Sequence, residues 1–252
     1  MKIAIVRKVP ASLANALCAV PPDPPIDVAR AREQHAEYRG ALESRGLEVR
    51  TIAADEATPD CCFVEDTAVV ADGVALITRP GAVERRAETG PVAKMLAAYA
   101  ELVHMEAPAT LDGGDCMCVG TTIFVGKSLR TNEAGIARLA EVFAPRGFTI
   151  VPVALPPNVL HLKCICAPLG VDRITLVESA SPDSFPGVEV VRIPEAESYA
   201  ANVLAIGDHV LVAQGFPRTA ELLASAGYGI VTLDTGEFRK ADGALTCLSV
   251  LL

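Results

Sequence analysis

The stretch Phe63-Val-Glu-Asp-Thr-Ala-Val-Val70 is followed by Ala71-Asp-Gly73 and by a second apolar run at 74–78. Two apolar runs joined across an Asp-Gly turn are typical of a β-hairpin, so we predict strands over 62–70 and 74–78. A helix over about 83–100 and a strand near 102–105 follow. This unit therefore has the order strand, turn, strand, helix, strand.

Related units recur on both sides of this one. Points equivalent to Asp66, where a short apolar run begins, fall at Asp112, His161, Asn202 and Cys247. By subtraction of residue numbers they lie 46, 49, 41 and 45 residues apart, within the period range of propellers and repeat arrays. The other predicted strands are 2–6, 47–52, 115–119, 122–126, 148–152, 162–167, 174–178, 202–206, 210–214, 229–233 and 245–252, and the other predicted helices are 26–45, 131–143 and 217–226.

Helix boundaries have local signals as well. Asp27 is a predicted N-cap and Gly46 a predicted helix stop, and Thr131 or Asn132 caps the helix at 131–143. In the fourth unit, the Pro-containing segment 179–186 leaves room for only one or two helical turns. The last run, 245–252, is predicted to return to the first unit and to close the ring, which leaves no free sheet edge.

Five such units predict an α/β fold in which pseudo-symmetric ββαβ repeats form a five-bladed propeller around a central site. Residues 1–252 are expected to form one catalytic domain. The alternative is an open α/β sheet, because the same alternation of strands and helices also fits βαβ units. In a closed propeller, one end of each unit meets a common axis, so distant residues converge there.

The composition narrows the class of protein. Hydrophobic residues make up 51% of the 252 residues, enough for a large core, and the net charge is −9. An acidic chain argues against nucleic-acid binding, which needs a basic surface. No apolar run reaches the roughly 18 residues of a membrane span, and the start lacks the apolar segment of a secretion signal. We therefore expect a cytoplasmic protein without a membrane partner, and the sequence is compatible with a homodimer.

Eight cysteines are spread along the chain. Without an export signal, reduced thiols are expected rather than a disulfide framework. The two Cys-x-Cys pairs, Cys116/Cys118 and Cys164/Cys166, lie in apolar runs and are interpreted as small buried side chains. A four-cysteine zinc site is the alternative, but this spacing is not the usual one for zinc. No metal is expected.

Three residue types at the repeat points combine into a reactive set. Taken singly, Cys247 and His161 are typical of core residues, and Asp112 in Leu111-Asp-Gly-Gly-Asp115 is typical of a turn. Brought together on one axis, a thiol, an imidazole and a carboxylate form the nucleophile, base and orienting group of covalent catalysis. Glu65 and Asp66 add carboxylates inside an apolar run, which is costly unless they are paired or bind a ligand.

At this level of detail the chain resembles the dimethylarginine dimethylaminohydrolase family of the guanidine-modifying (pentein) superfamily, whose fold is a five-bladed α/β propeller. The resemblance covers nearly the whole chain, in the family's order and spacing. The segments that carry it are Phe63-Val-Glu-Asp-Thr-Ala-Val69, Arg79-Pro-Gly-Ala-Val-Glu-Arg-Arg86, Leu111-Asp-Gly-Gly-Asp115, Val125-Gly-Lys-Ser-Leu-Arg-Thr-Asn132, Leu160-His-Leu-Lys163 and Asp242-Gly-Ala-Leu-Thr-Cys-Leu-Ser-Val-Leu251.

The resemblance implies a role for each matching residue. It implies that Cys247 is the nucleophile, that His161 is the general acid and base, and that Asp112 orients His161. It further implies that the substrate is a methylated arginine, hydrolysed to citrulline and an alkylamine without a metal or an organic cofactor. The implied substrate-binding residues are Asp66 with Glu65 and Asp242 at the guanidinium, Asp60 at the α-amino group, Arg85 and Arg130 at the α-carboxylate, and Leu17 in the lid.

Physical chemistry supports these roles. A guanidinium is planar and stabilised by resonance, so carboxylates that bind it bidentately can hold its carbon in line with a sulfur nucleophile. The attacking species must be a thiolate, which the bound cation and His161 favour. His161 can then protonate the departing amine and deprotonate the water that releases citrulline.

Three alternatives remain. Arginine deiminases share the triad, but the resemblance implies a His-x-Asp motif there, whereas this chain has His161-Leu-Lys163. Loss of that carboxylate suits N-methyl groups, which cannot donate the same hydrogen bonds. A related hydrolase acting on another guanidine is the second alternative. A non-catalytic guanidine-binding module is the third.

Overall fold

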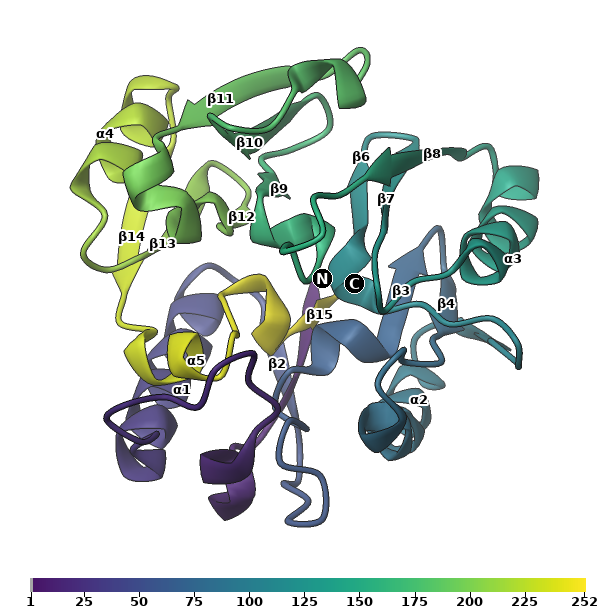
Figure 1. Ribbon diagram of the computed structural model, residues 1–252, viewed down its shortest axis with the longest axis horizontal. Coiled ribbons are helices and arrows are strands. Elements are labelled where there is room, and N and C mark those ends of the chain that lie inside the picture. Colours follow the sequence, from purple (N-terminus) through teal and green to yellow (C-terminus); the bar gives the residue numbers. More distant parts are fainter. Residues whose placement is uncertain (1) are drawn as a thin grey trace.

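The computed structural model describes residues 2–252, and in it five three-stranded sheets surround a central axis (Figure 1). In each sheet the inner strand pairs antiparallel with the middle strand, which pairs parallel with the outer strand. We number the blades I to V and give the strands of each from the inner to the outer one. Blade I holds β15 (Val250–Leu251), β1 (Ile3–Arg7) and β2 (Glu48–Ile52), blade II holds β3 (Ala68–Ala71), β4 (Val74–Ile77) and β5 (Glu101–His104), and blade III holds β6 (Cys116–Val119), β7 (Thr122–Lys127) and β8 (Thr149–Ala154). Blade IV holds β9 (Cys166–Pro168), β10 (Arg173–Val177) and β11 (Glu189–Ile193), and blade V holds β12 (Leu204–Ile206), β13 (His209–Ala213) and β14 (Gly229–Leu233).

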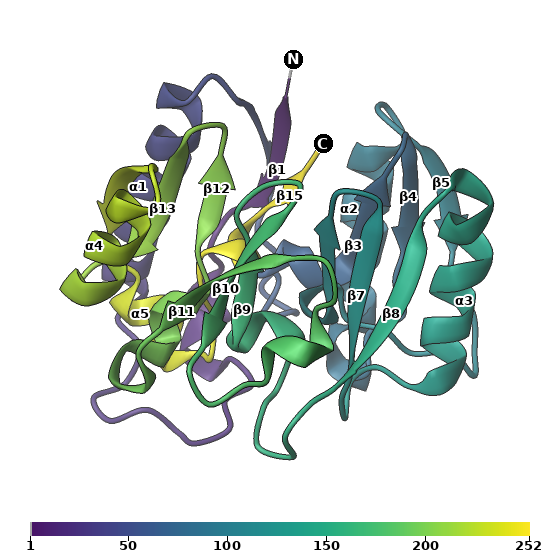
Figure 2. The same cartoon turned by 90° about the horizontal axis from the view of Figure 1, so that it is seen from above.

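This arrangement confirms the predicted five-bladed α/β propeller. The alternative, an open sheet, is wrong. Blade I is built from both ends of the chain, because β15 pairs antiparallel with β1 at Ala4–Leu251 and Ile5–Val250. The predicted return of the last strand to the first unit is therefore correct. Figure 2 shows both chain ends at one end of the molecule, with the segment that precedes the first long helix at the other end.

Parallel pairing needs a crossover, and helices on the outside of the ring supply it in four blades (Figure 1). Asp27 and Asn132 are the N-caps, as predicted: their side chains accept hydrogen bonds from Arg30 N and Gly135 N. In blade IV the crossover holds a single 3₁₀ turn, as the prolines predict. The α-helices are α1 (Val28–Ser44), α2 (Thr89–Leu96), α3 (Glu133–Phe143), α4 (Pro217–Ser225) and α5 (Gly236–Lys240).

Short 3₁₀ helices precede the inner strands, and here the sequence prediction was wrong. The runs at 62–70, 162–167 and 245–252 were predicted as continuous strands, but each begins with a 3₁₀ turn. A local side-chain bond explains the first: Thr67 Oγ1 donates to Val64 O and closes the turn. The 3₁₀ helices are η1 (Ala11–Asn15), η2 (Val64–Thr67), η3 (Val83–Glu88), η4 (Gly113–Asp115), η5 (Ala144–Arg146), η6 (Leu162–Cys164), η7 (Pro182–Ser184), η8 (Glu195–Ala201) and η9 (Thr246–Leu248).

Other differences are smaller. The helix predicted over 83–100 is divided into η3 and α2, and α2 ends at Leu96. Pro91 explains the division, because proline lacks an N–H and is tolerated only in a first helical turn. The strand β11 and the five-residue helix α5 were not predicted.

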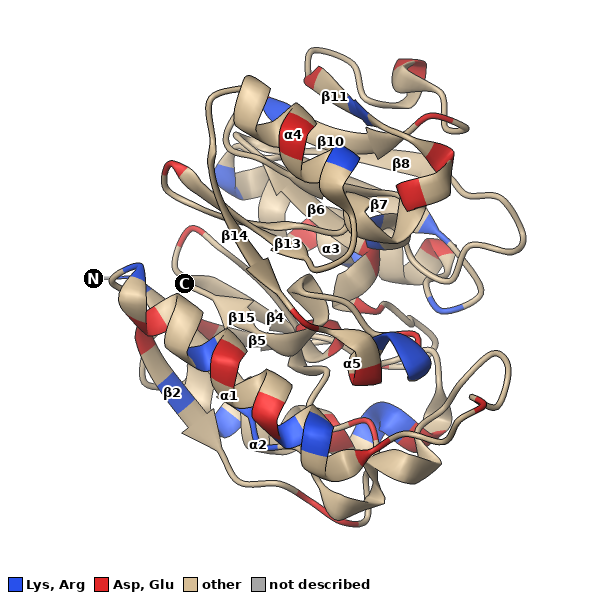
Figure 3. Ribbon diagram, turned by 90° about the vertical axis from the view of Figure 1, so that its left-hand side faces the viewer, with Lys and Arg blue, Asp and Glu red and all other residues tan. Residues whose placement is uncertain are grey.

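The outer surface carries mixed charge. Figure 3 shows acidic and basic residues interspersed along α1, where Arg30 pairs with Glu33 one turn away and with Asp234 in the loop before α5. Within residues 2–252, none of the helices is both long and apolar enough to cross a membrane. All eight cysteines are free thiols.

Candidate active site

The five repeat points occupy equivalent places in the five blades. Each lies in, or directly beside, the 3₁₀ helix that leads into the inner strand of its blade. Because the inner strands surround the axis, these helices meet at one end of it. Asp66 lies within η2, Asp112 is the N-cap of η4, His161 is the N-cap of η6, Asn202 is the C-cap of η8 and Cys247 lies within η9.

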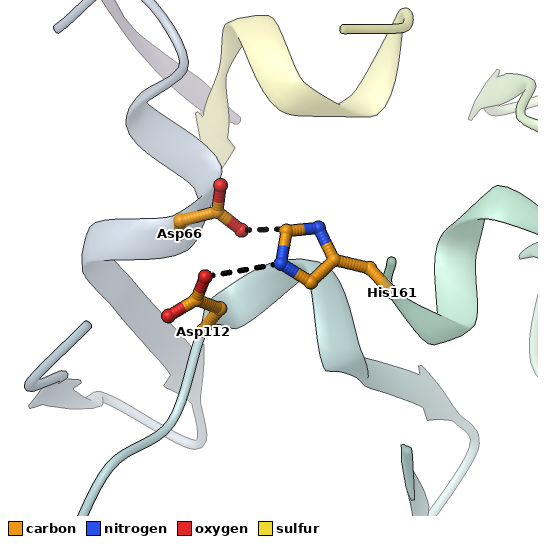
Figure 4. Close-up of side chains that lie close together, drawn as sticks. All are labelled: Asp66, Asp112 and His161. Carbon is orange, nitrogen blue, oxygen red and sulfur yellow. Dashed lines mark hydrogen bonds and ion pairs between the residues drawn. The ribbon is translucent and has the colours of Figure 1, made fainter. Parts of the chain in front are cut away.

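His161 contacts two carboxylates from neighbouring blades (Figure 4). Its Nε2 lies 3.0 Å from Asp112 Oδ2, and its Nδ1 lies 4.0 Å from Asp66 Oδ1. Burial alone would lower the pKa of His161, but the charges of Asp66, Asp112 and Asp115 outweigh it and raise the pKa to about 9. The imidazole is therefore a cation at neutral pH. Its Nε2–H faces Asp112, whereas its Nδ1–H has no contact with that carboxylate.

Asp112 is fixed by the loops around it. It is fully buried, and its Oδ1 accepts a hydrogen bond from Gly81 N at 2.9 Å. Its backbone N donates to Thr131 Oγ1 at 3.2 Å. Arg130 Nη1 lies 3.9 Å from Asp112 Oδ2. A carboxylate held by this many partners keeps the His161 ring in one orientation.

The glycine pair after Asp112 is needed for close packing. A Cβ at Gly113 would lie 2.0 Å from Glu65 O, and one at Gly114 would lie 2.8 Å from both Asp66 Oδ1 and His161 Nδ1. Gly114 N also donates to Asp66 Oδ1 at 2.8 Å. The glycines therefore let this backbone approach Glu65, Asp66 and His161 closely.

Asp66 is held by Arg85. Arg85 Nη1 donates to Asp66 Oδ2 at 2.5 Å, while Nε and Nη2 bond Glu88, and Nη2 also bonds Phe63 O. Burial would raise the pKa of Asp66, but His161 and Arg85 lower it to about 2. Arg85 is only 6% exposed, so it is a buried residue and not a solvated one at the surface.

These groups surround a small cavity at the end of the axis. Cys247, Asp66 and His161 all face it. Arg130, Asp242, Leu160 and Leu17 line both this cavity and a wider groove outside it, so they lie at its mouth. The full lining is Leu17, Asp60, Phe63, Asp66, Arg85, Arg130, Leu160, His161, Ala241, Asp242, Gly243 and Cys247.

The Cys247 thiol is partly buried in this cavity. Burial and the nearby charges of Glu65 and Asp66 raise its pKa well above the usual value for cysteine. Without a bound cation, the thiol is therefore protonated at neutral pH. Gly243 lets the preceding segment pack closely, since a Cβ there would lie 2.3 Å from Phe63 Cε1.

The segment after η1 covers the mouth through backbone contacts. Leu17 N donates to both carboxylate oxygens of Asp60 at 3.2 Å, and Ala19 N donates to Asp242 Oδ2 at 2.6 Å. The Leu17 side chain is 40% exposed. The two carboxylates that bind this lid segment are also two of the predicted substrate-binding residues.

Glu65 does not line this cavity. It lies on the far side of the ring, where it lines a separate axial cavity of about 190 Å³ together with Lys163, Cys116 and Cys118. Its Oε1 accepts from Lys163 Nζ at 2.6 Å and its Oε2 accepts from Thr246 Oγ1 at 2.7 Å. Adjacent residues in the tight turn η2 face different sides, so Asp66 reaches the candidate site and Glu65 does not.

Two buried acids of the site were not predicted. Asp115 Oδ2 accepts from Ser128 Oγ and Thr131 Oγ1, and its Oδ1 accepts from Leu162 N, so it joins the loops of blades III and IV. Glu88 forms the second ion pair of Arg85. A sequence signal existed for Asp115, which directly precedes an apolar run, where an unpaired carboxylate is costly.

One group of side chains within residues 2–252 has ligand atoms close enough together to hold a metal ion. It consists of Asp66, Asp112 and His161, whose ligand atoms lie within 4.8 Å of one another. Their charge state does not suit a metal. A doubly protonated imidazole has no free lone pair, and Arg85 already neutralises Asp66. The set fits an ion-paired proton-transfer group.

Comparisons with known proteins give the family of this chain. The family model described as "N,N dimethylarginine dimethylhydrolase, eukaryotic" matches residues 24–181. The chain is 41% identical over 256 residues to the N(G),N(G)-dimethylarginine dimethylaminohydrolase of Streptomyces coelicolor, covering 100% of this chain and 97% of the relative.

Solved structures of such enzymes have the same fold. A Cys-to-Ser variant of the Pseudomonas aeruginosa enzyme, complexed with citrulline, matches with a TM-score of 0.94 and 34% identity, over 99% of this chain and 98% of that one. A His-to-Gly variant of a dimethylarginine dimethylaminohydrolase, in an adduct with S-methyl-L-thiocitrulline, matches with a TM-score of 0.95, 34% identity and full coverage of both chains. By sequence and by structure, this chain belongs to the dimethylarginine dimethylaminohydrolase family.

Proposed function

We propose that this protein hydrolyses Nω-methylated L-arginines, asymmetric dimethylarginine and monomethylarginine, to L-citrulline and dimethylamine or methylamine. The observation that carries the proposal is the cavity in which a cysteine thiol, a histidine cation and several carboxylates from different blades face one another. The family membership supports the same reaction, and the citrulline complex of a relative supports the product.

The cavity suits an arginine-like molecule bound with its guanidinium inward. Asp66 lines only the inner cavity and Asp242 lies at its rim, so together they provide negative charge for the guanidinium. Each oxygen of Asp66 accepts one hydrogen bond in the free protein and keeps a lone pair for a second. Asp60 would bind the α-amino group, and Leu17 would cover it.

We assign Arg130 as the main residue that binds the substrate's α-carboxylate. Arg130 lies at the mouth of the cavity. Within residues 2–252, its guanidinium donates no hydrogen bond to another side chain, and its nearest carboxylate is that of Asp112 at 3.9 Å. Arg85, by contrast, uses four of its five N–H groups on Asp66, Glu88 and Phe63 O. Its main role would be to hold Asp66, with one N–H left for the substrate.

In the first half of the reaction, the bound guanidinium would offset the negative field of Asp66 that keeps the Cys247 thiol protonated. The thiol then releases its proton to solvent, and Sγ attacks the guanidinium carbon to give a tetrahedral adduct. The His161 Nδ1–H donates its proton to the methylated nitrogen, and the C–N bond breaks. Dimethylamine leaves, and a covalent thiouronium remains on Cys247.

In the second half, neutral His161 accepts a proton from water at Nδ1, and the hydroxide attacks the thiouronium carbon. The hydroxyl proton of this adduct passes to solvent as the C–S bond breaks, which releases citrulline and returns the sulfur as a thiolate. Asp112 would hold the ring in place during both transfers. The adduct of a relative with S-methyl-L-thiocitrulline supports a covalent route in this family.

The preference for methylated substrates rests on Lys163, the second residue after His161. Lys163 lies at the axial cavity, paired with Glu65, and not at the substrate cavity. The lining of the substrate cavity therefore has no carboxylate from this blade to bind the free amino groups of an unsubstituted guanidinium. Arginine deiminase activity remains the alternative reaction.

Product analysis tests the proposal. Purified protein is incubated side by side with arginine, monomethylarginine and dimethylarginine, and ammonia, methylamine, dimethylamine and citrulline are quantified. Dimethylamine release at a higher kcat/KM than ammonia release supports it, and the reverse order makes the protein a deiminase. Cys247→Ser should abolish turnover and covalent labelling, whereas a guanidine-binding module would show neither to begin with.

Residues 1–252 would act as one catalytic domain, with a small-molecule substrate and no cofactor. Eight free thiols support a reducing compartment such as the cytoplasm. Light scattering on the purified protein tests the homodimer that the sequence allows.

A further inference from the structure

Asn202 has a side chain whose hydrogen bonds are all directed at the segments that carry His161 and Cys247. It is 4% exposed. Its Nδ2 donates to Lys163 O at 2.9 Å and to Thr246 Oγ1 at 3.0 Å, and its Oδ1 accepts from Thr246 N at 3.0 Å. In the opposite amide orientation, the NH₂ group would face Thr246 N–H and the amide oxygen would face Lys163 O. Only the observed orientation therefore satisfies these partners.

The partners of Asn202 adjoin the reacting residues in sequence. Lys163 is two residues after His161, in the same 3₁₀ turn, and Thr246 directly precedes Cys247. One amide group therefore holds the backbone of blade IV beside the acid–base and the backbone of blade I beside the nucleophile. A shift of either segment would break a bond to Asn202.

These bonds are part of a closed ring. Thr246 Oγ1 donates to Glu65 Oε2, Glu65 Oε1 accepts from Lys163 Nζ, and Lys163 O accepts from Asn202. Lys163 Nζ also donates to Gly113 O, next to Asp112. Four blades thus contribute one residue each to the closed ring, and Gly113 of blade III is joined to it through Lys163. Thr246, Glu65, Gly113 and Lys163 each lie within two positions of Cys247, Asp66, Asp112 or His161.

We propose that Asn202 is a positioning residue for the reaction, which fixes the separation of Cys247 and His161 through Thr246 and Lys163. The proposal rests on the proposed function for its kinetic consequences. Asn202 does not line the substrate cavity, so it acts without touching substrate. It also gives the fifth repeat point, which has no reactive side chain, a part in the site.

The kinetic signature follows from that geometry. Misplacing a reacting group by about 1 Å can cost roughly 100-fold in rate. We therefore expect Asn202→Ala to lower kcat about 10- to 100-fold with KM within about twofold of wild type, because Asp60, Asp66 and Arg130 keep their contacts. Thr246→Val, which lacks the hydroxyl, should show the same pattern, and Thr246→Ser should recover most of that loss.

The control is Thr219→Val. Thr219 is fully buried on α4, and its Oγ1 donates at 2.7 Å to Glu197 of η8, the helix that Asn202 terminates. The control therefore removes a buried hydrogen bond from the same segment, on the side away from the ring. Thermal unfolding measures how much stability each variant loses, so that the control can be compared with Asn202→Ala. The kcat values are then compared at a temperature at which all variants are folded.

A second measurement needs no substrate. The rate at which iodoacetamide labels Cys247 is followed by peptide mass spectrometry, and freeing η9 in Asn202→Ala should raise it severalfold over both wild type and Thr219→Val. If no methylarginine is turned over, the proposed function fails while this comparison still decides the role of Asn202. A kcat and a labelling rate equal to those of Thr219→Val would overturn the proposal, and if Asn202→Ala does not fold, equal kcat values for Thr246→Ser and Thr246→Val would overturn it.

Discussion

His161 Nε2 lies 3.0 Å from Asp112 Oδ2, and the two side chains are 7% and 0% exposed as residues, so the pair is shielded from water. Blade IV supplies the imidazole and blade III the carboxylate. Since 49 residues separate them, their contact depends on the closure of the propeller. This pair leads to two predictions.

Replacing Asp112 by Asn keeps the shape of the side chain and removes its charge. We expect kcat to fall by about 10²- to 10⁴-fold, the range that a positioned acid–base contributes, because the ring loses both its orientation and part of its raised pKa. KM should change little, since Asp112 does not line the substrate cavity. Steady-state citrulline formation measures both constants. A kcat within threefold of wild type would show that Asp112 does not orient His161.

The raised pKa of His161 also predicts how stability depends on pH. Because the folded pKa of about 9 exceeds the usual 6.5, protonated His161 stabilises the fold fully below pH 6.5, and this contribution is lost as pH rises towards 9. The upper bound is about 3 kcal/mol. Urea unfolding at pH 6 and pH 9.5 should therefore show a larger loss for wild type than for His161→Gln. Equal losses would mean that the imidazole is neutral in the folded protein.

The hairpin turns and most helix caps could be predicted because their signals are local. Asp-Gly turns, the N-caps Asp27 and Asn132, and the helix stop at Gly46 depend on residues a few positions away. The convergence of Asp66, Asp112, His161 and Cys247 followed from the period itself. Their roles came from the resemblance to a family, because a lone cysteine or histidine in an apolar run is usually structural.

What could not be predicted is which way each residue of a tight turn faces. An apolar run at 62–70 is compatible with a strand, in which Glu65 and Asp66 alternate, and with the observed turn. Whether Glu65 faces the substrate or Lys163 depends on blade IV, about 100 residues away. Arg85 is similar: its burial depends on Glu88 and on Asp66 across the blade, and charge patterns alone favour a surface position.

Arg85 and Arg130 should separate in their kinetic effects. Breaking a buried ion pair costs about 3–5 kcal/mol, so Arg85→Gln should lose stability of that order and should lower kcat by releasing Asp66. Arg130→Gln removes a charged hydrogen bond to the substrate and should raise KM by about 10- to 100-fold with stability nearly unchanged. Thermal unfolding and initial rates on both variants test this. A mainly KM effect in Arg85→Gln would restore the carboxylate-binding role that the sequence implies.

Glu65 can be tested as a structural ion pair. Glu65→Met leaves the Lys163 ammonium buried without its partner and should destabilise the fold by about 3–5 kcal/mol. The double variant Glu65→Met with Lys163→Met removes both charges and should recover much of that stability. KM should stay within about threefold of wild type in both, because neither residue lines the substrate cavity. A tenfold rise in KM would instead identify Glu65 as a substrate ligand.

The Cys247 thiol gives the last prediction. Because burial, Glu65 and Asp66 raise its pKa well above the usual value, the resting enzyme carries little thiolate at pH 7. Labelling of Cys247 by iodoacetamide should therefore be slow at pH 7 and should rise about tenfold per pH unit up to at least pH 9, since the thiolate is the reactive form. Peptide mass spectrometry separates Cys247 from Cys18 and Cys164.

Asp66→Asn sharpens this experiment, because it removes one of the negative charges that raise the thiol pKa. The pH profile of Cys247 labelling should shift to lower pH in this variant, in the same direction as the shift that a bound guanidinium would cause. A wild-type profile that reaches its plateau below pH 8 would show instead that the thiolate is preformed. The enzyme would then not depend on the substrate cation to generate its nucleophile.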